Sequence, residues 1–392
     1  MPTSLIFHRT ALAQRLARLI LADAVGSAAS SGVFLAAPRR TGKSTFLRED
    51  LRPQLQALQA QVLYVDLWAD RKADPGDVMV GAVRAALARH DGIVTRLARS
   101  AGMEKVTVGG MAFSLDRVGL EAQVSLSAAL AELSDEVRQP IVLIIDEAQH
   151  AITTDKGYDA LYALKAARDE LNSSRHHGLR IVATGSNRDK LAMLRNSKDQ
   201  AFFGAPLQPF PPLGRDYVEW FCQRVDLPGA LDPDEVDRLF ERAARRPEIL
   251  GAAADALRFD FELEAADTGR RFAEAVEQQI QAADAQTLRV IHALTPLQSA
   301  VLRVLAARKD QYAPFEEGTI VAYRAVLASI APGEKLDPDV SNTQAALQAL
   351  QDKSLIWREK RGVYALEETG LADLLAADGL LDVVPPPAAS GT

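Results

Sequence analysis

Residues 37 to 45, APRRTGKST, have the residue types that bind a phosphate chain in a loop before a helix. Lys43 can place its charge on the β- and γ-phosphates, and the hydroxyl of Ser44 can bind Mg²⁺. Gly42 lets the backbone approach the anion, whose other contacts would be loop N–H groups. The G-x-x-x-x-G-K-[ST] pattern starts with glycine, where this chain has Ala37. A methyl group is tolerable there if φ stays negative, so we expect a loop of normal path.

The segment IVLIIDEAQH, residues 141 to 150, ends an apolar run with two acids. Asp146 would hold the metal ion through water, and Glu147 would act as the general base on the attacking water. Ligands collect at the carboxyl edge of a parallel sheet, so the loop and the acids converge if their strands are neighbours. The alternative is a strand that simply ends in two solvated acids.

A third polar group ends the next apolar run, in TGSN at 184 to 187. Asn187, or Ser186 as the weaker choice, would lie beside the γ-phosphate, although both are also common turn residues. An arginine can neutralise charge in the transition state, and Arg246 is the candidate within the chain. Three other arginines are weaker candidates for acting on a neighbouring subunit, and all four can equally be solvated surface cations: Arg188, Arg195 and Arg215.

The elements that would position these groups are short, continuous apolar runs separated by helical patterns. Such runs are typical of a parallel sheet buried on both faces, and they occur at 32 to 38, 62 to 67, 141 to 146 and 179 to 185. The proline-rich stretch at 205 to 213 predicts an edge strand. Alternation around Gly109 and Gly110 predicts an inserted β-hairpin within residues 104 to 120.

The second half of the chain is helical from residue 214, and a short two-stranded turn near its end resembles a winged helix. We divide the chain into an α/β core at 1–213, a helical lid at 214–285, a winged-helix domain at 286–378 and a disordered tail at 379–392.

Composition excludes several classes of protein. The only cysteine among the 392 residues, Cys222, excludes an internal disulfide and a multi-thiolate zinc site. There is no apolar run long enough to span a bilayer, so we expect a cytoplasmic protein without membrane contact. A net charge of −7 argues against nonspecific coating of nucleic acid.

Several segments, taken in order, resemble the archaeal-type and STAND branches of the P-loop ATPases, which are close to AAA+ proteins. The resemblance covers about residues 5 to 255 and rests on FHRTALAQRLARL, APRRTGKST, VLYVDLW, IVLIIDEAQH, IVATGSN and RRPEIL. It implies an α/β parallel-sheet core of the ASCE/AAA+-like class with an inserted β-hairpin, a helical lid and often a C-terminal winged helix. It also implies ATP and Mg²⁺ as ligands.

The resemblance assigns roles to individual residues. It matches Lys43 and Ser44 to the Walker A pair and Asp146 and Glu147 to the Walker B pair. Asn187 falls at the sensor-1 position and Arg246 at the sensor-2 position, while Phe7 and Arg9 fall in the segment that often borders the adenine. The chain departs from the pattern at Ala37 and has no clear arginine after AFFGAP for a subunit-bridging finger. The phosphate-binding set is the whole loop: Ala37, Pro38, Arg39, Arg40, Thr41, Gly42, Lys43, Ser44 and Thr45.

We therefore expect an ATP-hydrolysing molecular switch whose nucleotide state acts on the winged helix. A processive helicase is disfavoured because TGSN replaces a helicase-like S-A-T and no second motor domain follows. The alternatives are a DNA-associated regulatory ATPase of the transposition-targeting or defence type, and a nucleotide-holding scaffold. ATP-dependent oligomers are also possible for this chain.

The winged helix would bind duplex DNA or a protein. The candidate contact residues of the winged helix are Asn342, Thr343, Gln344 and Gln348 on the recognition helix and Arg358, Lys360 and Arg361 on the wing.

Overall fold

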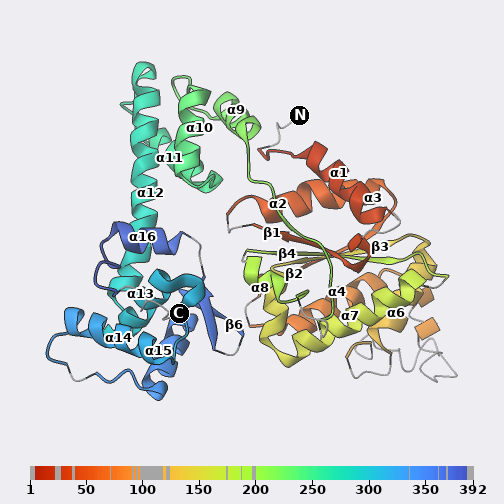
Figure 1. Cartoon of the computed structure of the whole chain (residues 1–392). Coiled ribbons are helices and arrows are strands. Elements are labelled where there is room, and N and C mark those ends of the chain that lie inside the picture. Colours follow the sequence, from red (N-terminus) through yellow and green to blue (C-terminus); the bar gives the residue numbers. More distant parts are fainter. Residues whose placement is uncertain are drawn as a thin grey trace. The chain divides into compact units, whose positions relative to one another are not determined.

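A computed structural model describes most of the chain, and the described residues form two units, Met1–Trp220 and Phe221–Thr392 (Figure 1). The helix α9 (Arg215–Arg224) contains the boundary between these units. The described residues are 5–22, 28–37, 40–70, 72–90, 92–93, 96–97, 118–120, 124–173, 175–186, 188–196, 200–334, 336–360, 362–367 and 370–385.

The first unit is built on a five-stranded parallel sheet in the order β2-β3-β4-β1-β5. This confirms the predicted parallel sheet, and the proline-rich β5 pairs at its edge with β1 alone. In register, Asp66 lies opposite Asp146 and Ala36 opposite Gly185, so these strands end at one edge. The strands are β1 (Val33–Ala36), β2 (Gln61–Asp66), β3 (Ile141–Asp146), β4 (Leu179–Gly185) and β5 (Leu207–Pro209).

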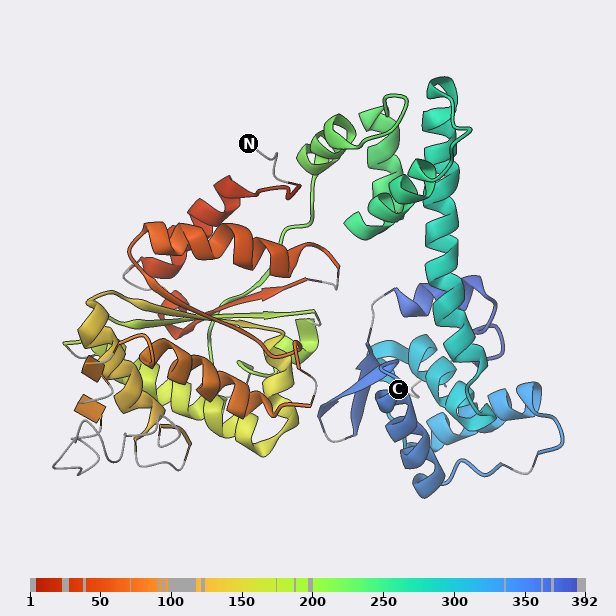
Figure 2. The ribbon, with the colours of Figure 1, turned by 180° about the vertical axis from the view of Figure 1, so that it is seen from behind.

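Helices cover both faces of this sheet, as Figures 1 and 2 show. On β3, Val142 and Ile144 pack into the core on one face, whereas Ile141, Leu143 and Ile145 pack into the core on the other. Burial on both faces is the reason that the strands are apolar without alternation. One face carries α1 (Thr10–Leu21), α2 (Lys43–Phe46), η2 (Leu47–Leu51) and α3 (Arg52–Ala57); the other carries α4 (Pro75–Leu87), α6 (Leu126–Val137) and α7 (Asp155–Ser173).

The elements α2, η2 and α3 form one continuous helix with a π turn at Leu47–Leu51, since the residues that join them are all right-handed helical.

Three short elements are also described in this unit: η1 (Ala28–Ser31), η4 (Ala148–Thr153) and α8 (Arg188–Ala192). The predicted hairpin at 104 to 120 lies outside the described residues except for its last three positions, of which Val118 bridges to Val124.

The second unit consists of helices followed by a two-stranded antiparallel ribbon of β6 and β7. Its long helix α12 reaches both of its parts: Phe272 and Val276 are buried beside α11, and Ile291 is buried in the core of the C-terminal part. The elements are α10 (Pro233–Arg242), α11 (Pro247–Arg258), η5 (Ala265–Asp267), α12 (Thr268–His292), α13 (Pro296–Arg308), η6 (Lys309–Gln311), α14 (Glu317–Ile330), α15 (Val340–Asp352), β6 (Ile356–Lys360), β7 (Val363–Leu366) and α16 (Leu371–Ala377).

The expected domain limits differ from the structure at two places. The limit at 285/286 lies inside α12, where no glycine or proline interrupts the helix. Part of the expected tail is also packed, because four apolar side chains contact the core of the C-terminal part: Leu380, Leu381, Val383 and Val384. Residues 386 to 392 lie outside the described residues. Among the helices that are described, none is long and apolar enough to cross a membrane.

Candidate functional site

The loop after β1 contains two described residues with left-handed backbone conformation, Arg40 and Gly42. Ala37 is buried with a negative φ, as expected, and its N–H bonds to the carbonyl of Gly185 at 3.1 Å, which prolongs the β1–β4 pairing. Arg40 has φ 61° and Gly42 has φ 79°, a value that favours glycine. The loop thus reaches the start of α2 without a glycine at position 37, although Pro38 and Arg39 lie outside the described residues.

Gly42 precedes a helix whose first N–H groups have no side-chain cap. Such N–H groups and the positive end of the helix dipole attract anions. A pocket of about 200 Å³ opens at this helix start and is lined by Arg40, Thr41, Gly42, Lys43, Ser44, Thr45 and Glu147. Its size and lining suit a phosphate group, and the only described acid in that lining is Glu147.

Lys43 joins this loop to the two acids after β3. The Lys43 side chain is 5% exposed, and its Nζ lies 2.6 Å from Oε1 of Glu147 and 3.7 Å from Oδ1 of Asp146. The strand β4 separates β1 from β3, but all three end at one edge of the sheet, which is why the charges meet. A lysine and two carboxylates therefore converge beside a helix start.

Asp146 is fully buried and is held by the strands on both sides of β3. Its Oδ1 accepts the hydroxyl of Thr184 from β4 and the N–H of Glu147, and its Oδ2 accepts the Tyr64 hydroxyl of β2 at 3.1 Å. Burial, followed by the charge of Asp146, raises the pKa of Tyr64, so the phenol remains a donor. The sequence reasoning missed Tyr64 and Thr184, whose signal is a hydroxyl inside an apolar strand.

Glu147 immediately precedes η4 and has left-handed backbone, φ 55°. Its Oε2 accepts the side-chain amide of Gln149 at 2.6 Å, the hydroxyl of Ser186 at 2.7 Å and the N–H of Ser186 at 3.2 Å. Burial raises the pKa of Glu147, but the charge and hydrogen bond of Lys43, with the bonds from Ser186 and Gln149, outweigh it and lower that pKa to about 2. The carboxylate is thus ionised at neutral pH and is a weak base while Lys43 contacts it.

Gln149 fits beside Glu147 because residue 185 has no side chain. A Cβ at Gly185 would lie 2.5 Å from Oε1 of Gln149, which is too close. That oxygen is buried and has no hydrogen-bond partner among the described residues, while the Nε2 of Gln149 also lies 3.3 Å from the hydroxyl of Ser186. A glycine at a strand end is the sequence signal for this close approach.

Of the other expected residues of the site, the structure describes Ser186 and the four arginines. Asn187 is outside the described residues, whereas Ser186, the weaker sequence choice, contacts Glu147. Arg246 precedes α11 in the second unit and donates from Nε to Glu248 at 2.8 Å. The three arginines considered for a neighbouring subunit are placed as follows: Arg188 is exposed at the start of α8, Arg195 donates to Asn196, and Arg215 donates to Glu219.

The segment expected to border an adenine is fixed to the start of α9 and the chain before it. The ring centroid of Phe7 lies 5.5 Å from the ring centroid of Tyr217 and 5.6 Å from the ring centroid of Trp220. The guanidinium of Arg9 donates to the carbonyls of Pro211 and Pro212 and lies 4.9 Å from the ring centre of Phe210. Burial lowers the pKa of Arg9, although nearby acids oppose this shift.

On α15 the structure corrects one sequence expectation. Thr343 is 1% exposed and donates to the carbonyl of Pro338, because it lies on the core side of the helix, so it cannot contact a base. Asn342 is exposed, but its amide donates to Asp337 and Asp339. The other candidates are Gln344 and Gln348, both exposed, and Arg358 on β6; the side chains of Lys360 and Arg361 lie outside what the structure describes.

No family model and no curated protein matches this sequence. Solved structures do resemble the chain over nearly its whole length. The ORC2 protein of Aeropyrum pernix in its ADP form has a TM-score of 0.56 at 14% identity, with 96% of this chain and 94% of that chain covered. The Walker-type ATPase of Pyrococcus abyssi has a TM-score of 0.51 at 17% identity, with 95% and 96% covered. The chain therefore shares the fold of these two solved structures, with an α/β parallel-sheet core followed by a helical part that contains a two-stranded ribbon.

Proposed function

We propose that this chain binds ATP with Mg²⁺ in the pocket at the start of α2 and hydrolyses it. The observation that carries the proposal is the meeting of Lys43 and Glu147, 2.6 Å apart, at the mouth of a helix-start pocket. A buried lysine beside uncapped N–H groups suits phosphates, and an ionised carboxylate at the same place suits a general base. Two solvated acids at a strand end, the plainer alternative, do not fit the burial of Asp146.

In this proposal each residue of the site has a separate role in binding or hydrolysis. Lys43 and the loop N–H groups bind the phosphates, and the Ser44 hydroxyl and Asp146 hold Mg²⁺, Asp146 through water. Hydroxyl and carboxylate oxygens are the ligands that Mg²⁺ prefers, and the metal supplies neutralisation of phosphate charge when bound. Glu147 accepts the proton of the attacking water once Lys43 has moved to the phosphates. Asn187 and Arg246 are proposed as further phosphate contacts.

The switch part of the proposal rests on α12. This 25-residue helix contacts α11 at its first half and the winged-helix core at its second, so a rotation of the lid helices would carry the winged helix with it (Figure 1). Rigid elements that link two parts are a physical route for such coupling.

Breaking α12 tests this coupling. Ala282→Pro, at an exposed position in the middle of the helix, should kink it at a cost of about 3 kcal/mol. We expect ATP turnover to persist but ATP to stop changing amide hydrogen exchange in α13 and α15. Ala282→Ser is the matched control. An ATP effect on exchange that is equal in both variants would contradict the coupling.

For the output we favour a protein over duplex DNA. Asp339, whose carboxylate accepts the side-chain amide of Asn342, lies at the start of α15, and Gln348 donates to Asp352 at its end. Acids at both ends of a recognition helix repel DNA phosphates. Salt-dependent binding of a duplex at low ionic strength, weakened by Arg358→Ala, would instead support the DNA-associated regulatory ATPase.

Gln149 is expected to position Glu147 for the reaction. Gln149→Met keeps the length of the side chain but removes its hydrogen bonds to Glu147 and Ser186. We expect ATP turnover to fall about tenfold, because one such hydrogen bond contributes on the order of 1 kcal/mol, with ATP affinity within about twofold of wild type. Gln344→Met, exposed on α15, is the control. Unchanged turnover would show that Glu147 needs no such support.

The alanine at position 37 should matter little for ATP binding. Because Ala37 has a negative φ and a regular hydrogen bond, Ala37→Gly should leave the Kd for ATP within about twofold and cost roughly 0.5–1 kcal/mol of stability through backbone entropy. Isothermal titration and thermal unfolding measure the two effects. A large change in Kd would mean that the loop follows another path when ATP is bound.

A further inference from the structure

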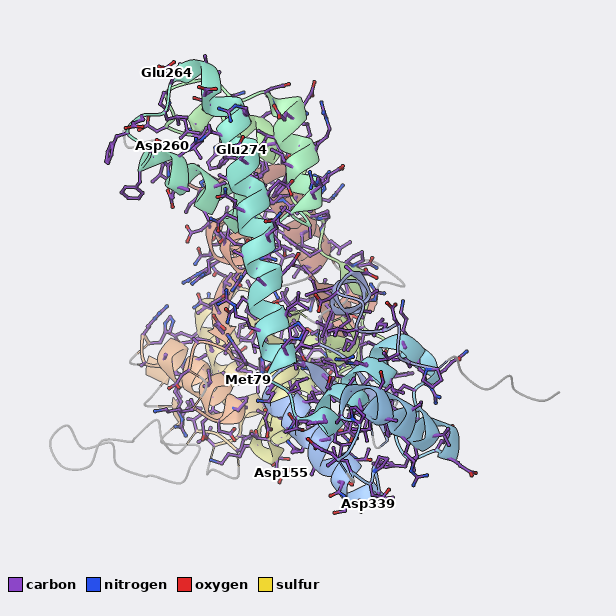
Figure 3. The ribbon with its side chains drawn as sticks, turned by 90° about the vertical axis from the view of Figure 1, so that its left-hand side faces the viewer. Met79, Asp155, Asp260, Glu264, Glu274 and Asp339 are labelled. Atoms are coloured by element: carbon purple, nitrogen blue, oxygen red, sulfur yellow. The ribbon has the colours of Figure 1, made fainter. Side chains whose placement is uncertain are left out.

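The turn from Phe259 to Glu264, between α11 and η5, presents two phenylalanine rings to solvent. Phe259 is 77% exposed and Phe261 is 93% exposed. The turn itself is braced, because Asp260 accepts the N–H of Glu262 at 3.3 Å and forms an ion pair with Arg271 of α12 at 2.7 Å. Figure 3 labels Asp260 and Glu264 at the end of α12 that is remote from the winged helix. Two exposed aromatic rings on one braced turn form an apolar surface that is available for contact.

The charges around these rings select the partner. Glu262 and Glu264 are exposed, and neither side chain has an ion pair among the described residues. Residues 255 to 267 contain five acids and one base. Such a surface repels DNA and anionic lipid. It requires an apolar site with a cationic rim, and we call it the acidic aromatic turn.

The N-terminal helix of this same chain offers that site. Residues 5 to 22 contain no acid. On α1, Arg15, Arg18 and Leu19 are exposed, and the spacing i, i+3, i+4 places them on one face. Leu19 is 51% exposed, and within the described residues no ion pair involves Arg15 or Arg18.

We propose that the acidic aromatic turn of one copy binds the Arg15, Arg18 and Leu19 face of α1 in a second copy. The two surfaces differ, so a single contact leaves a free turn and a free α1 on the pair. The pair either closes by a second, reciprocal contact about a twofold axis or adds further copies. Two rings bury only about 150–250 Å² each, less than the roughly 800 Å² per partner of a stable interface. The association is consequently weak, and salt weakens it further.

The experiment is sedimentation velocity of the full chain without nucleotide, over a wide range of concentration at low and high salt. We expect the wild-type average mass to rise above that of the monomer with concentration at low salt and to fall at high salt. Phe259→Ser with Phe261→Ser should leave a monomer under all conditions. Since both rings are exposed, thermal unfolding should confirm that this double variant is folded. Because no nucleotide is present, a lack of ATPase activity would not affect the result.

Charge exchange identifies the two surfaces. A chain with Glu262→Arg and Glu264→Arg, and a chain with Arg15→Glu and Arg18→Glu, should each remain monomeric at low salt. Mixing the two chains, or combining all four changes in one chain, should restore association. Wild-type chain that stays monomeric at every concentration would overturn the proposal, and the acidic aromatic turn would then be expected to bind a different protein. Association that survives the phenylalanine changes, or that charge exchange does not restore, would overturn it as well.

Discussion

Glu147→Gln is expected to reduce ATP turnover by at least about 100-fold while ATP binding is kept. The amide cannot accept the proton of the attacking water, so the chemical step fails. Binding should even tighten, because Lys43 no longer loses a buried carboxylate 2.6 Å away when it moves to the phosphates. Phosphate release from Mg-ATP and equilibrium binding of ATP measure the two effects separately.

Glu317→Gln, an exposed change in α14, is the matched control and should leave both quantities unchanged. Turnover that remains near wild type in Glu147→Gln would remove Glu147 from the chemistry. Lost ATP binding in the same variant would show that the carboxylate serves to build the pocket instead.

Lys43→Ala should weaken ATP binding by about 100-fold or more and abolish turnover. The change removes the point charge for the phosphates and leaves two carboxylates, Asp146 and Glu147, facing them without the lysine charge. Like charges held close together in a partly buried site are costly. Titration calorimetry with ATP and Mg²⁺ checks the loss, and Lys353→Ala, an exposed change after α15, is the control.

The double variant Lys43→Ala with Glu147→Gln separates the two causes of this loss. If the uncompensated carboxylate contributes, the double variant should bind ATP more tightly than Lys43→Ala alone, which a double-mutant cycle quantifies. Equal affinity of the single and double variants would leave only the lost lysine charge. ATP affinity that is unchanged in Lys43→Ala would contradict the assignment of the pocket.

The sheet and the meeting of the main charges were predictable from the sequence. The strands are mostly apolar and show no regular alternation because both faces are buried, and parallel strands end at one edge, so Lys43, Asp146 and Glu147 had to approach one another. The edge position of β5 followed from its prolines.

The support of Glu147 was not predictable in the same way. Its carboxylate reaches Gln149 and Ser186 because its own backbone is left-handed, φ 55°, and because Gly185 leaves room for the glutamine. Nothing in the residue types fixes that φ. From TGSN we expected Asn187, or Ser186 as the weaker choice, beside the γ-phosphate, and the contact of Ser186 with Glu147 was not predicted.

Two features of the second unit were also not predictable from the sequence. A helical pattern cannot tell one long helix from two when neither glycine nor proline lies between them, and α12 therefore passed through an expected domain limit. Thr343 was expected on the outer side of α15. It lies instead on the buried side of the helix, which also carries Ala346, Leu347 and Leu350.

The central claim is that Lys43 leaves Glu147 for the phosphates of ATP and thereby frees the base. A structure of the chain with Mg²⁺ and a non-hydrolysable ATP analogue tests it most directly. We predict that Nζ of Lys43 lies within hydrogen-bond distance of a phosphate oxygen and is no longer in contact with Oε1 of Glu147. A bound analogue with the 2.6 Å contact between Lys43 and Glu147 intact would contradict it.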